Sequence, residues 1–333
     1  LGGEFSSRGR DQLFEGVQKE MYSTFENTFM MYLPRLCEHC LNPACVASCP
    51  SGALYKRDED GIVLVDQERC RGWRYCVSGC PYKKVYFNWK RGRAEKCIFC
   101  YPRLEAGLTT LCAHSCVGRI RYVGVLLYDA DRIVRAAAAP RDRDVYPAHL
   151  EMLLDPHDPE IIRAAAAQGI APNVLDAARR SPVYALIRKW HLALPLHPEF
   201  RTLPMVWYVP PLSPISSQAD DPAATGELID RMRIPVAYLA NLLTAGDEAP
   251  VRLALRRLSA LRDFMRTRRV EQRDDTKVLD AVGLDTASVE KIYRLLALAP
   301  LAERFVLPTA PVLDQGVFAR QGRCGQTGRK QKT

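Results

Sequence analysis

Eleven of the twelve cysteines in this chain lie between Cys37 and Cys116, in three groups. Each group ends on a cysteine four positions after the one before it, and a proline follows the last cysteine of the first two groups. The cysteines are Cys37, Cys40, Cys45 and Cys49, then Cys70, Cys76 and Cys80, then Cys97, Cys100, Cys112 and Cys116. This spacing is typical of ferredoxins, in which the last cysteine of a run binds the iron–sulfur cluster of another run. The pattern therefore predicts both the cofactor and the pairing of the groups.

Disulfides and zinc are the alternative uses of so many cysteines. Disulfide frameworks occur mostly in small secreted domains, whereas these cysteines crowd one third of a chain of 333 residues. Zinc could be bound by the CxxC pairs together with His39 and His114. However, the prolines after Cys49 and Cys80 fit iron–sulfur clusters better. We therefore expect His39 and His114 to form hydrogen bonds near cluster sulfurs.

The ferredoxin pairing rule assigns ligands for two clusters. Four thiolates form a [4Fe–4S] site: Cys37, Cys40, Cys45 and Cys80. Three thiolates form the second site: Cys49, Cys70 and Cys76. Trp73 stands where the spacing requires the fourth cysteine of that site, and an indole offers only an N–H donor and cannot bind iron. The second site is therefore predicted to hold a [3Fe–4S] cluster beside Trp73.

The third group leaves its ligand count open. Its thiolates are those of Cys97, Cys100, Cys112 and Cys116. By the same rule the first three need a fourth ligand, and the last should serve a different cluster. The remaining cysteine, Cys324, lies far away in an unpatterned tail. Either these four hold one cluster by themselves or a further group is missing; because the sequence begins with Leu1 rather than Met, we expect a fragment of a longer protein.

The remaining sequence predicts an α+β fold, with a ferredoxin-like iron–sulfur module followed by a mainly helical and extended C-terminal region. Short β-rich segments flank turns at 58–61 and 91–92, between the cysteine groups. Beyond Asp129 helices are predicted at 159–167, 182–192, 235–245, 249–269 and 286–298. The predicted division is a lead-in at 1–33, the iron–sulfur module at 34–128, the C-terminal region at 129–307 and a disordered tail at 308–333.

Residues 194–214 are rich in proline and aromatic side chains, which forbids a regular helix and favours an extended path. Trp207, Tyr208 and Phe200 are of the residue types that anchor protein interfaces. We expect this segment to be a docking strap for another subunit. The alternative is that it packs on its own domain.

The composition gives no sign of a membrane-spanning segment or of a nucleic-acid partner. No run approaches the roughly 18 consecutive apolar residues that a transmembrane helix needs, so no direct transmembrane segment is expected. The net charge of +9 could attract nucleic acid, but no recognition motif accompanies it. We interpret the charge as a solvated or docking surface and expect no nucleic-acid partner.

The chain resembles the beta subunits of membrane-bound respiratory nitrate reductases, within the larger set of iron–sulfur subunits of molybdopterin oxidoreductases. The likeness extends to about residue 307. Its most specific segments are 34–53, 70–90, 95–107, 116–131, 194–215 and 233–247. The segments beyond the cysteines distinguish this family from a generic ferredoxin.

The resemblance implies three [4Fe–4S] clusters and one [3Fe–4S] cluster, the latter produced by a tryptophan at the position of Trp73. It agrees with the two ligand sets given above. It further implies that Cys97, Cys100 and Cys112 share a cluster with a cysteine of an N-terminal group, and that Cys116 completes that group's own cluster. It gives Cys324 no role.

The resemblance also implies a function. A chain of this family is a non-catalytic electron-transfer subunit of a quinone-dependent oxidoreductase. Electrons pass from a quinol-oxidising b-haem membrane subunit (gamma) through the clusters to a molybdopterin-containing alpha subunit, which reduces nitrate to nitrite. The complex places this subunit peripherally on the cytoplasmic face of the cell membrane.

Two other functions compete with this interpretation. One is a beta subunit of a related molybdoenzyme, such as nitrite oxidoreductase or chlorate or selenate reductase, whose cluster chain would look nearly the same. The other is a free ferredoxin-type carrier. The long extension after Cys116 argues against a free carrier, because an electron shuttle needs no such extension.

Overall fold

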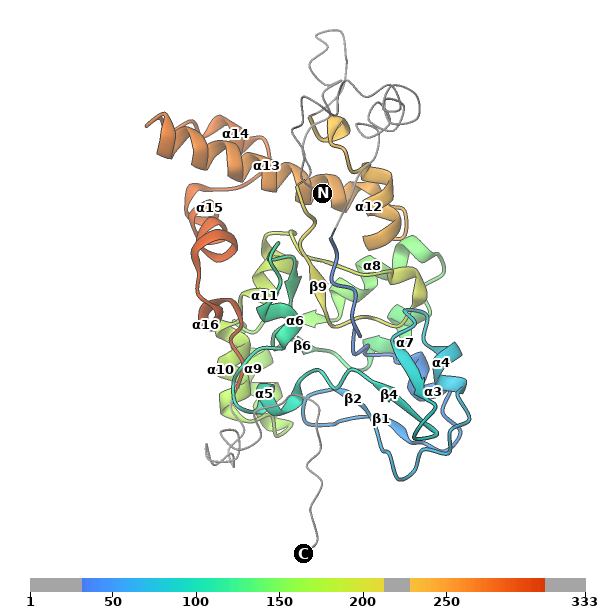
Figure 1. Cartoon of the computed structure of the whole chain (residues 1–333). Coiled ribbons are helices and arrows are strands. Elements are labelled where there is room, and N and C mark those ends of the chain that lie inside the picture. The colour runs from blue at the N-terminus through green and yellow to red at the C-terminus, as the bar shows by residue number, and fades with distance from the viewer. Residues whose placement is uncertain (1–31, 213–227, 309–333) are drawn as a thin grey trace, which may run out of the picture.

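The computed structural model describes residues 32–212 and 228–308. The iron–sulfur module forms one end of the molecule, and the long helix α13 crosses the other end (Figure 1). The predicted lead-in and tail lie almost wholly outside the described residues. The mixture of small antiparallel sheets and helices confirms the α+β prediction.

Two short hairpins organise the cysteine groups. Strands β1 (Leu54–Lys56) and β2 (Val63–Val65) pair antiparallel across the predicted turn, as do β3 (Val85–Asn88) and β4 (Arg93–Lys96). Gly61 and Gly92 have positive φ in these turns, a conformation that glycine adopts without steric penalty. Each hairpin therefore connects one cysteine group to the next and fixes their separation.

Several of the cysteines lie in short helices or next to them. They are α3 (Ala44–Ala47), α4 (Tyr75–Gly79), α5 (Tyr101–Glu105) and α6 (Leu111–His114). Helix α3 packs against α4, and Gly79 faces Ser48 so closely that a Cβ at Gly79 would lie 2.9 Å from the Ser48 Cβ. Glycine at this position therefore allows the first and second cysteine groups to approach each other.

The C-terminal region begins with strands that tie it to the module. A three-stranded sheet has the order β5 (Arg121–Tyr122), β9 (Trp207–Tyr208), β8 (Leu194–Pro195), and β6 (Leu127–Tyr128) pairs with β7 (Leu153–Leu154). Helices surround these strands: α7 (Arg132–Ala137), α8 (Asp142–Glu151), α9 (Pro159–Ala167), α10 (Pro172–Arg180) and α11 (Pro182–Tyr184). The largest hydrophobic core cluster contains side chains from both sides of residue 128, so the two regions share one core.

The last helices pack around α13 (Glu248–Val270), which contacts α12 (Val236–Leu243), α14 (Lys277–Asp280) and α15 (Thr286–Tyr293). The Asp247 side chain accepts a hydrogen bond from the Ala249 N–H and so caps α13. Helix α16 (Leu301–Arg304) is the last helix of the described residues. The predicted helices at 159–167, 235–245, 249–269 and 286–298 are confirmed within two residues, the last one continuing from α15 as a π-helical turn. None of the helices in the described ranges combines the length and apolar character needed to cross a membrane.

The prediction that Trp207 and Tyr208 form a docking strap is wrong. Both side chains are completely buried, because β9 lies between β5 and β8 in the centre of its sheet. Phe200 packs edge-on against Tyr82 at 5.3 Å between ring centroids. The segment is extended, as expected, but it binds its own chain.

Candidate iron–sulfur sites

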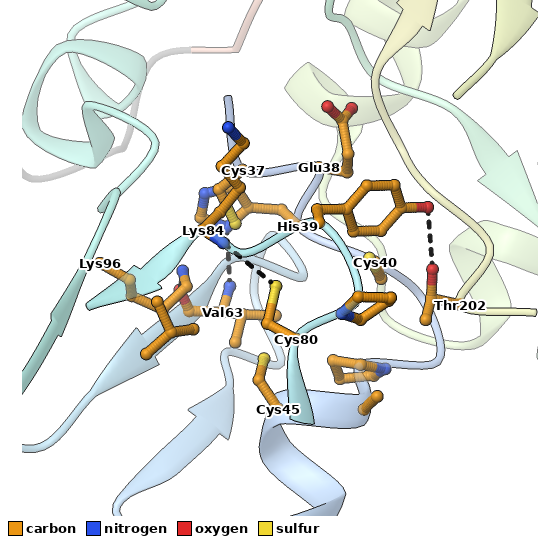
Figure 2. A pocket seen from close by; sticks show the side chains of 15 residues that line it. Cys37, Glu38, His39, Cys40, Cys45, Val63, Cys80, Lys84, Lys96 and Thr202 are labelled. Atoms are coloured by element: carbon orange, nitrogen blue, oxygen red, sulfur yellow. Dashed lines mark hydrogen bonds between the residues drawn. The ribbon is translucent and has the colours of Figure 1, made fainter. Parts of the chain in front are cut away.

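The first and second cysteine groups meet at one pocket, whose empty volume of about 360 Å³ includes a part open to solvent. Four thiols line it: Cys37, Cys40, Cys45 and Cys80. They come from the loop before α3, from α3 itself and from the end of α4 (Figure 2). The set is the one that the ferredoxin pairing rule assigns to a four-thiolate site.

The loop 37–42 is held in place by the extended segment 202–205. The Leu41 N–H donates to the Leu203 carbonyl at 2.9 Å, and the Met205 N–H donates to the Glu38 carbonyl at 3.1 Å. Tyr82, two residues after Cys80, donates or accepts at 3.0 Å with the Thr202 hydroxyl. The walls of the pocket are thus fixed by backbone contacts that link residues about 160 positions apart.

Burial dominates the acid–base character of these thiols. It raises the pKa of Cys37 and Cys40, and it raises the pKa of Cys45 to about 12. A bound metal reverses this preference, because a coordinated thiol is deprotonated. The pocket therefore suits thiols whose negative charge is compensated by iron rather than by water.

His39 provides a test of whether the pocket fits a cluster. Its Nδ1 accepts a hydrogen bond from the Val63 N–H at 3.1 Å, so the ring proton lies on Nε2. Burial, and then the charge of Lys96, lower the pKa of His39 and keep the ring neutral. Within the described part of the chain, Nε2 has no hydrogen-bond partner, although His39 is only 3% exposed and lines the pocket. A buried N–H donor at this wall fits a cluster sulfur as its acceptor.

The two predicted histidines differ. His114 is exposed at the end of α6, whereas His39 is enclosed by the first pocket and by the ring of Phe99 at 4.4 Å. Hydrogen bonding near cluster sulfurs therefore stays a prediction with structural support for His39 alone.

A second pocket has an empty volume of about 280 Å³, part of it open to solvent, and like the first it is lined by residues in or next to α3 and α4. Its sulfur-bearing residues are Cys49, Cys70 and Cys76. Trp73 belongs to the same lining and is 54% exposed, so its ring borders both the pocket and solvent. Gly72 allows this arrangement, because it has φ +73 and a Cβ there would lie 2.5 Å from the Gly92 carbonyl oxygen.

Backbone N–H groups surround the sulfurs of the second site. Burial alone would raise the pKa of Cys49, but hydrogen bonds from Leu54, Ser51 and Ala53 outweigh it and lower the pKa. The Ala94 N–H donates to the Cys70 sulfur at 3.4 Å. These donors stabilise thiolates and would also tune a bound cluster.

The third group is gathered less completely. Burial raises the pKa of Cys97, and the nearby Cys112 thiol adds to that rise. The buried Cys116 sulfur accepts from the Ile120 N–H at 3.3 Å, on the side of the C-terminal region. Cys100, at the start of α5, has φ +50. Nothing in this arrangement decides between the two ligand schemes expected for the group.

The positions of the thiols can be compared with those needed to bind a single metal ion. Across residues 32–212 and 228–308, no three Cys, His, Asp or Glu side chains converge as they would around a single metal ion. A zinc ion needs four ligands at about 2.0–2.3 Å from one centre. The described residues therefore present no arrangement of this kind for a single zinc ion.

A buried polar network next to Cys37 could not be foreseen from the sequence. Arg121 donates to the Tyr208 hydroxyl, to the Pro34 carbonyl at 3.2 Å and to the Cys37 carbonyl at 3.2 Å. The Tyr208 hydroxyl donates to Glu38 at 2.8 Å. Burial raises the pKa of Glu38 to about 7, against the opposing charge of Arg121. The only signal was the presence of charged residues beside cysteines, which does not distinguish buried from solvated charges.

Two family models match parts of the chain. Residues 28–126 match the 4Fe-4S dicluster domain, and residues 212–286 match the respiratory nitrate reductase beta C-terminal domain. The chain is 62% identical to the respiratory nitrate reductase 2 beta chain of Escherichia coli (strain K12), over 98% of this chain and 65% of that protein. It is 52% identical to the nitrate reductase beta chain of Bacillus subtilis (strain 168), over 95% and 66%.

The chain thus spans about two thirds of the length of those relatives. It covers 88% of the respiratory nitrate reductase beta chain of Bradyrhizobium sp., with 43% identity over 90% of this chain. The dicluster match agrees with the paired cysteine groups, and the C-terminal match lies in the region that a free ferredoxin would lack. The chain belongs to the family of respiratory nitrate reductase beta chains.

Proposed function

We propose that this chain relays electrons from a quinol-oxidising b-haem membrane subunit (gamma) to a molybdopterin-containing alpha subunit that reduces nitrate to nitrite. The observation that carries the proposal is the presence of two thiol-lined pockets, one with four thiols and one with three, in a chain of the nitrate reductase beta family. Both pockets suit one-electron carriers. The described residues present no arrangement that we assign to nitrate chemistry.

The clusters supply one-electron redox chemistry, and the chain holds and tunes them. We assign a [4Fe–4S] cluster to Cys37, Cys40, Cys45 and Cys80, and a [3Fe–4S] cluster to Cys49, Cys70 and Cys76. Trp73 lines the same pocket and would supply no iron ligand there, because an indole offers only an N–H donor. Backbone N–H groups such as those of Ala94 and Lys84 orient the sulfurs of Cys70 and Cys80.

Two further [4Fe–4S] clusters complete the proposed relay. Cys97, Cys100 and Cys112 would bind one of them, and Cys116 would contribute to the other. The proximity of Cys97 to Cys112 supports the first assignment. The remaining ligands of both clusters stay predictions.

The proposed complex lies on the cytoplasmic face of the membrane, with the gamma subunit providing the transmembrane part. We also propose the division into an iron–sulfur module at 34–128 and a docking region at 129–307. The shared hydrophobic core supports a rigid arrangement of the two, which a fixed electron path requires.

The experiment that tests the function is reoxidation of the purified complex. The full-length beta chain is isolated under mild conditions with whatever binds it, the clusters are reduced with dithionite, and nitrate is added while EPR follows the clusters. We expect a molybdenum protein to copurify and nitrate to reoxidise the clusters. Reoxidation by chlorate or selenate but not by nitrate would assign the chain to a related enzyme. Loaded clusters with no molybdenum partner would instead indicate a free carrier.

A further inference from the structure

Lys96 is a buried cation at the boundary between two cysteine sites. It is the last residue of β4, where Ala94 and Lys96 point inward while their neighbours Arg93 and Glu95 do not. Only 7% of Lys96 is exposed, and its side chain lines the first pocket (Figure 2). Lysine is almost never this buried unless its charge is compensated.

The protein itself gives Lys96 only neutral partners. Its ammonium donates to the Val63 carbonyl and to the Cys97 carbonyl, the latter at 2.8 Å. An ammonium has three N–H donors, so one is not accounted for by these two bonds. Among the described residues, no carboxylate lies within ion-pair distance of it. The negative charge that would stabilise Lys96 must therefore come from something else at this site.

The cysteines around Lys96 indicate where this negative charge would come from, because they are the predicted ligands of two clusters. Lys96 lines the first pocket together with Cys37 and Cys45, and its ammonium donates to the Cys97 carbonyl of the third cysteine group at 2.8 Å. Cys37 and Cys45 belong to the first pocket, whereas Cys97 belongs to the third cysteine group. The ammonium thus lies at the first pocket and beside the third cysteine group at once.

We propose that Lys96 is a counter-charge shared by two iron–sulfur clusters, the one at Cys37, Cys40, Cys45 and Cys80 and the one at Cys97, Cys100 and Cys112, and that it raises both reduction potentials. The inference rests on the proposed function. In each reduction one electron arrives from a neighbouring cluster, which is oxidised by losing that electron, and no bond or proton is exchanged. A fixed positive charge nearby favours the reduced form, because that form carries one more negative charge.

Lys96 is proposed to act through the reduction potentials of the clusters, so its test must measure those potentials and not activity alone. Lys96→Gln removes the charge in the full-length complex, and EPR-monitored redox titration measures every cluster. We expect the equilibrium constant for reduction to fall about tenfold at both clusters, which is about 59 mV for a one-electron couple. The [3Fe–4S] cluster at Cys49, Cys70 and Cys76 should keep its potential.

Two further variants serve as controls. Lys90→Gln makes the same charge change at an exposed lysine in the turn of the same hairpin and should leave all potentials unchanged. Lys96→Arg keeps the charge and should return both potentials toward those of the wild type. Equal potentials in the wild type and a fully loaded Lys96→Gln complex would overturn the inference, and so would a shift at one cluster alone.

The variants also test the proposal if they fail to hold the two clusters. If Lys96→Gln and the apolar, similarly sized Lys96→Met both lose the two clusters, Lys96→Arg decides: the proposal requires it to keep both clusters at wild-type potentials. Lost or shifted clusters in Lys96→Arg would mean that the hydrogen-bond geometry of lysine matters and not its charge. A wild-type complex without EPR-active clusters would instead refute the proposed function.

Discussion

The imidazole Nδ1 of His39 accepts a hydrogen bond from the backbone N–H of Val63 at 3.1 Å, which holds the ring proton on Nε2. That N–H is buried at the wall of the four-thiol pocket without a partner among the described residues. A hydrogen bond to a charged acceptor is worth about 1.5–3 kcal/mol. His39→Leu should therefore lower the equilibrium constant for reduction of the adjacent cluster by about tenfold or more, measured by EPR redox titration. His114→Leu is the matched control, since His114 is exposed, and unchanged potentials in both variants would contradict the assignment.

Trp73 determines the nuclearity that we assign to the second site. Trp73→Cys restores the fourth thiolate that the ferredoxin spacing requires. We expect the EPR signal of the oxidised [3Fe–4S] cluster to disappear and a [4Fe–4S] signal to appear on reduction. Trp89→Cys adds a cysteine at another exposed tryptophan and should leave the oxidised signal intact. A persisting three-iron signal in Trp73→Cys would show that something other than the missing ligand sets the cluster type.

The contact between Gly79 and Ser48 can be tested by coupling two substitutions. Gly79→Ala forces the new methyl group against the Ser48 side chain and should destabilise the protein by about 1–3 kcal/mol, seen as a lower Tm. Ser48→Gly removes the obstructing atoms. The double variant should then melt no lower than Ser48→Gly alone. Additive losses would show that the two residues do not determine how closely α3 and α4 approach.

In the network of Arg121 and Glu38, removing one charge should destabilise the protein more than removing both charges. Arg121→Met leaves Glu38 buried without its cation, so we expect a loss of about 3–5 kcal/mol. Glu38→Gln in the same background removes the orphaned charge and should recover part of the loss. The measurement is Tm across the double-mutant cycle. A double variant less stable than Arg121→Met would argue that the network does not act as a unit.

His149 predicts the response of stability to acid. It is completely buried beside Trp207, with 4.9 Å between the ring centroids, and burial lowers its pKa to about 3. In the unfolded chain this histidine binds a proton near its ordinary pKa of about 6.5. Its contribution to the free energy of unfolding is therefore fully present above that pH and is lost as the pH falls from about 6.5 toward 3. At pH 5 the loss from this residue is about 2 kcal/mol.

The comparison for that loss is made between variants, since acid affects other groups as well. His149→Phe should flatten the decline of Tm between pH 7 and pH 5, whereas the exposed His157→Phe should not. Parallel Tm curves for the wild type and His149→Phe would exclude His149 as the source.

Local patterns predicted the parts of the molecule that depend on local chemistry. The cysteine spacing grouped Cys80 with Cys37, and their thiols line one pocket. Helical periodicity predicted α12 and α13 nearly to their ends. The helices follow from residues within a few turns of one another, whereas the cysteine pairing follows from a spacing rule that links two separate runs.

The failures concern long-range contacts. Trp207 has the composition of an interface anchor, but its place in the centre of a sheet depends on pairing with Arg121 and Tyr122, far away in the sequence. Lys96 resembles the exposed Lys83 and Arg74 in the sequence, and only the fold separates the buried cation from the solvated ones. Burial of a charged residue near a cofactor cannot be predicted from one sequence without knowing what covers it.

The extended segment that holds the first cysteine loop also constrains how the protein is made. Leu41 and Glu38 receive their backbone partners from Leu203 and Met205. A chain emerging from the ribosome cannot form these bonds until the later residues have been synthesised, because domains fold as their contacts become available. Iron–sulfur insertion at Cys37 and Cys40 is therefore expected to follow synthesis of the C-terminal region, and a nascent chain stalled before Leu203 would present an open, incomplete site.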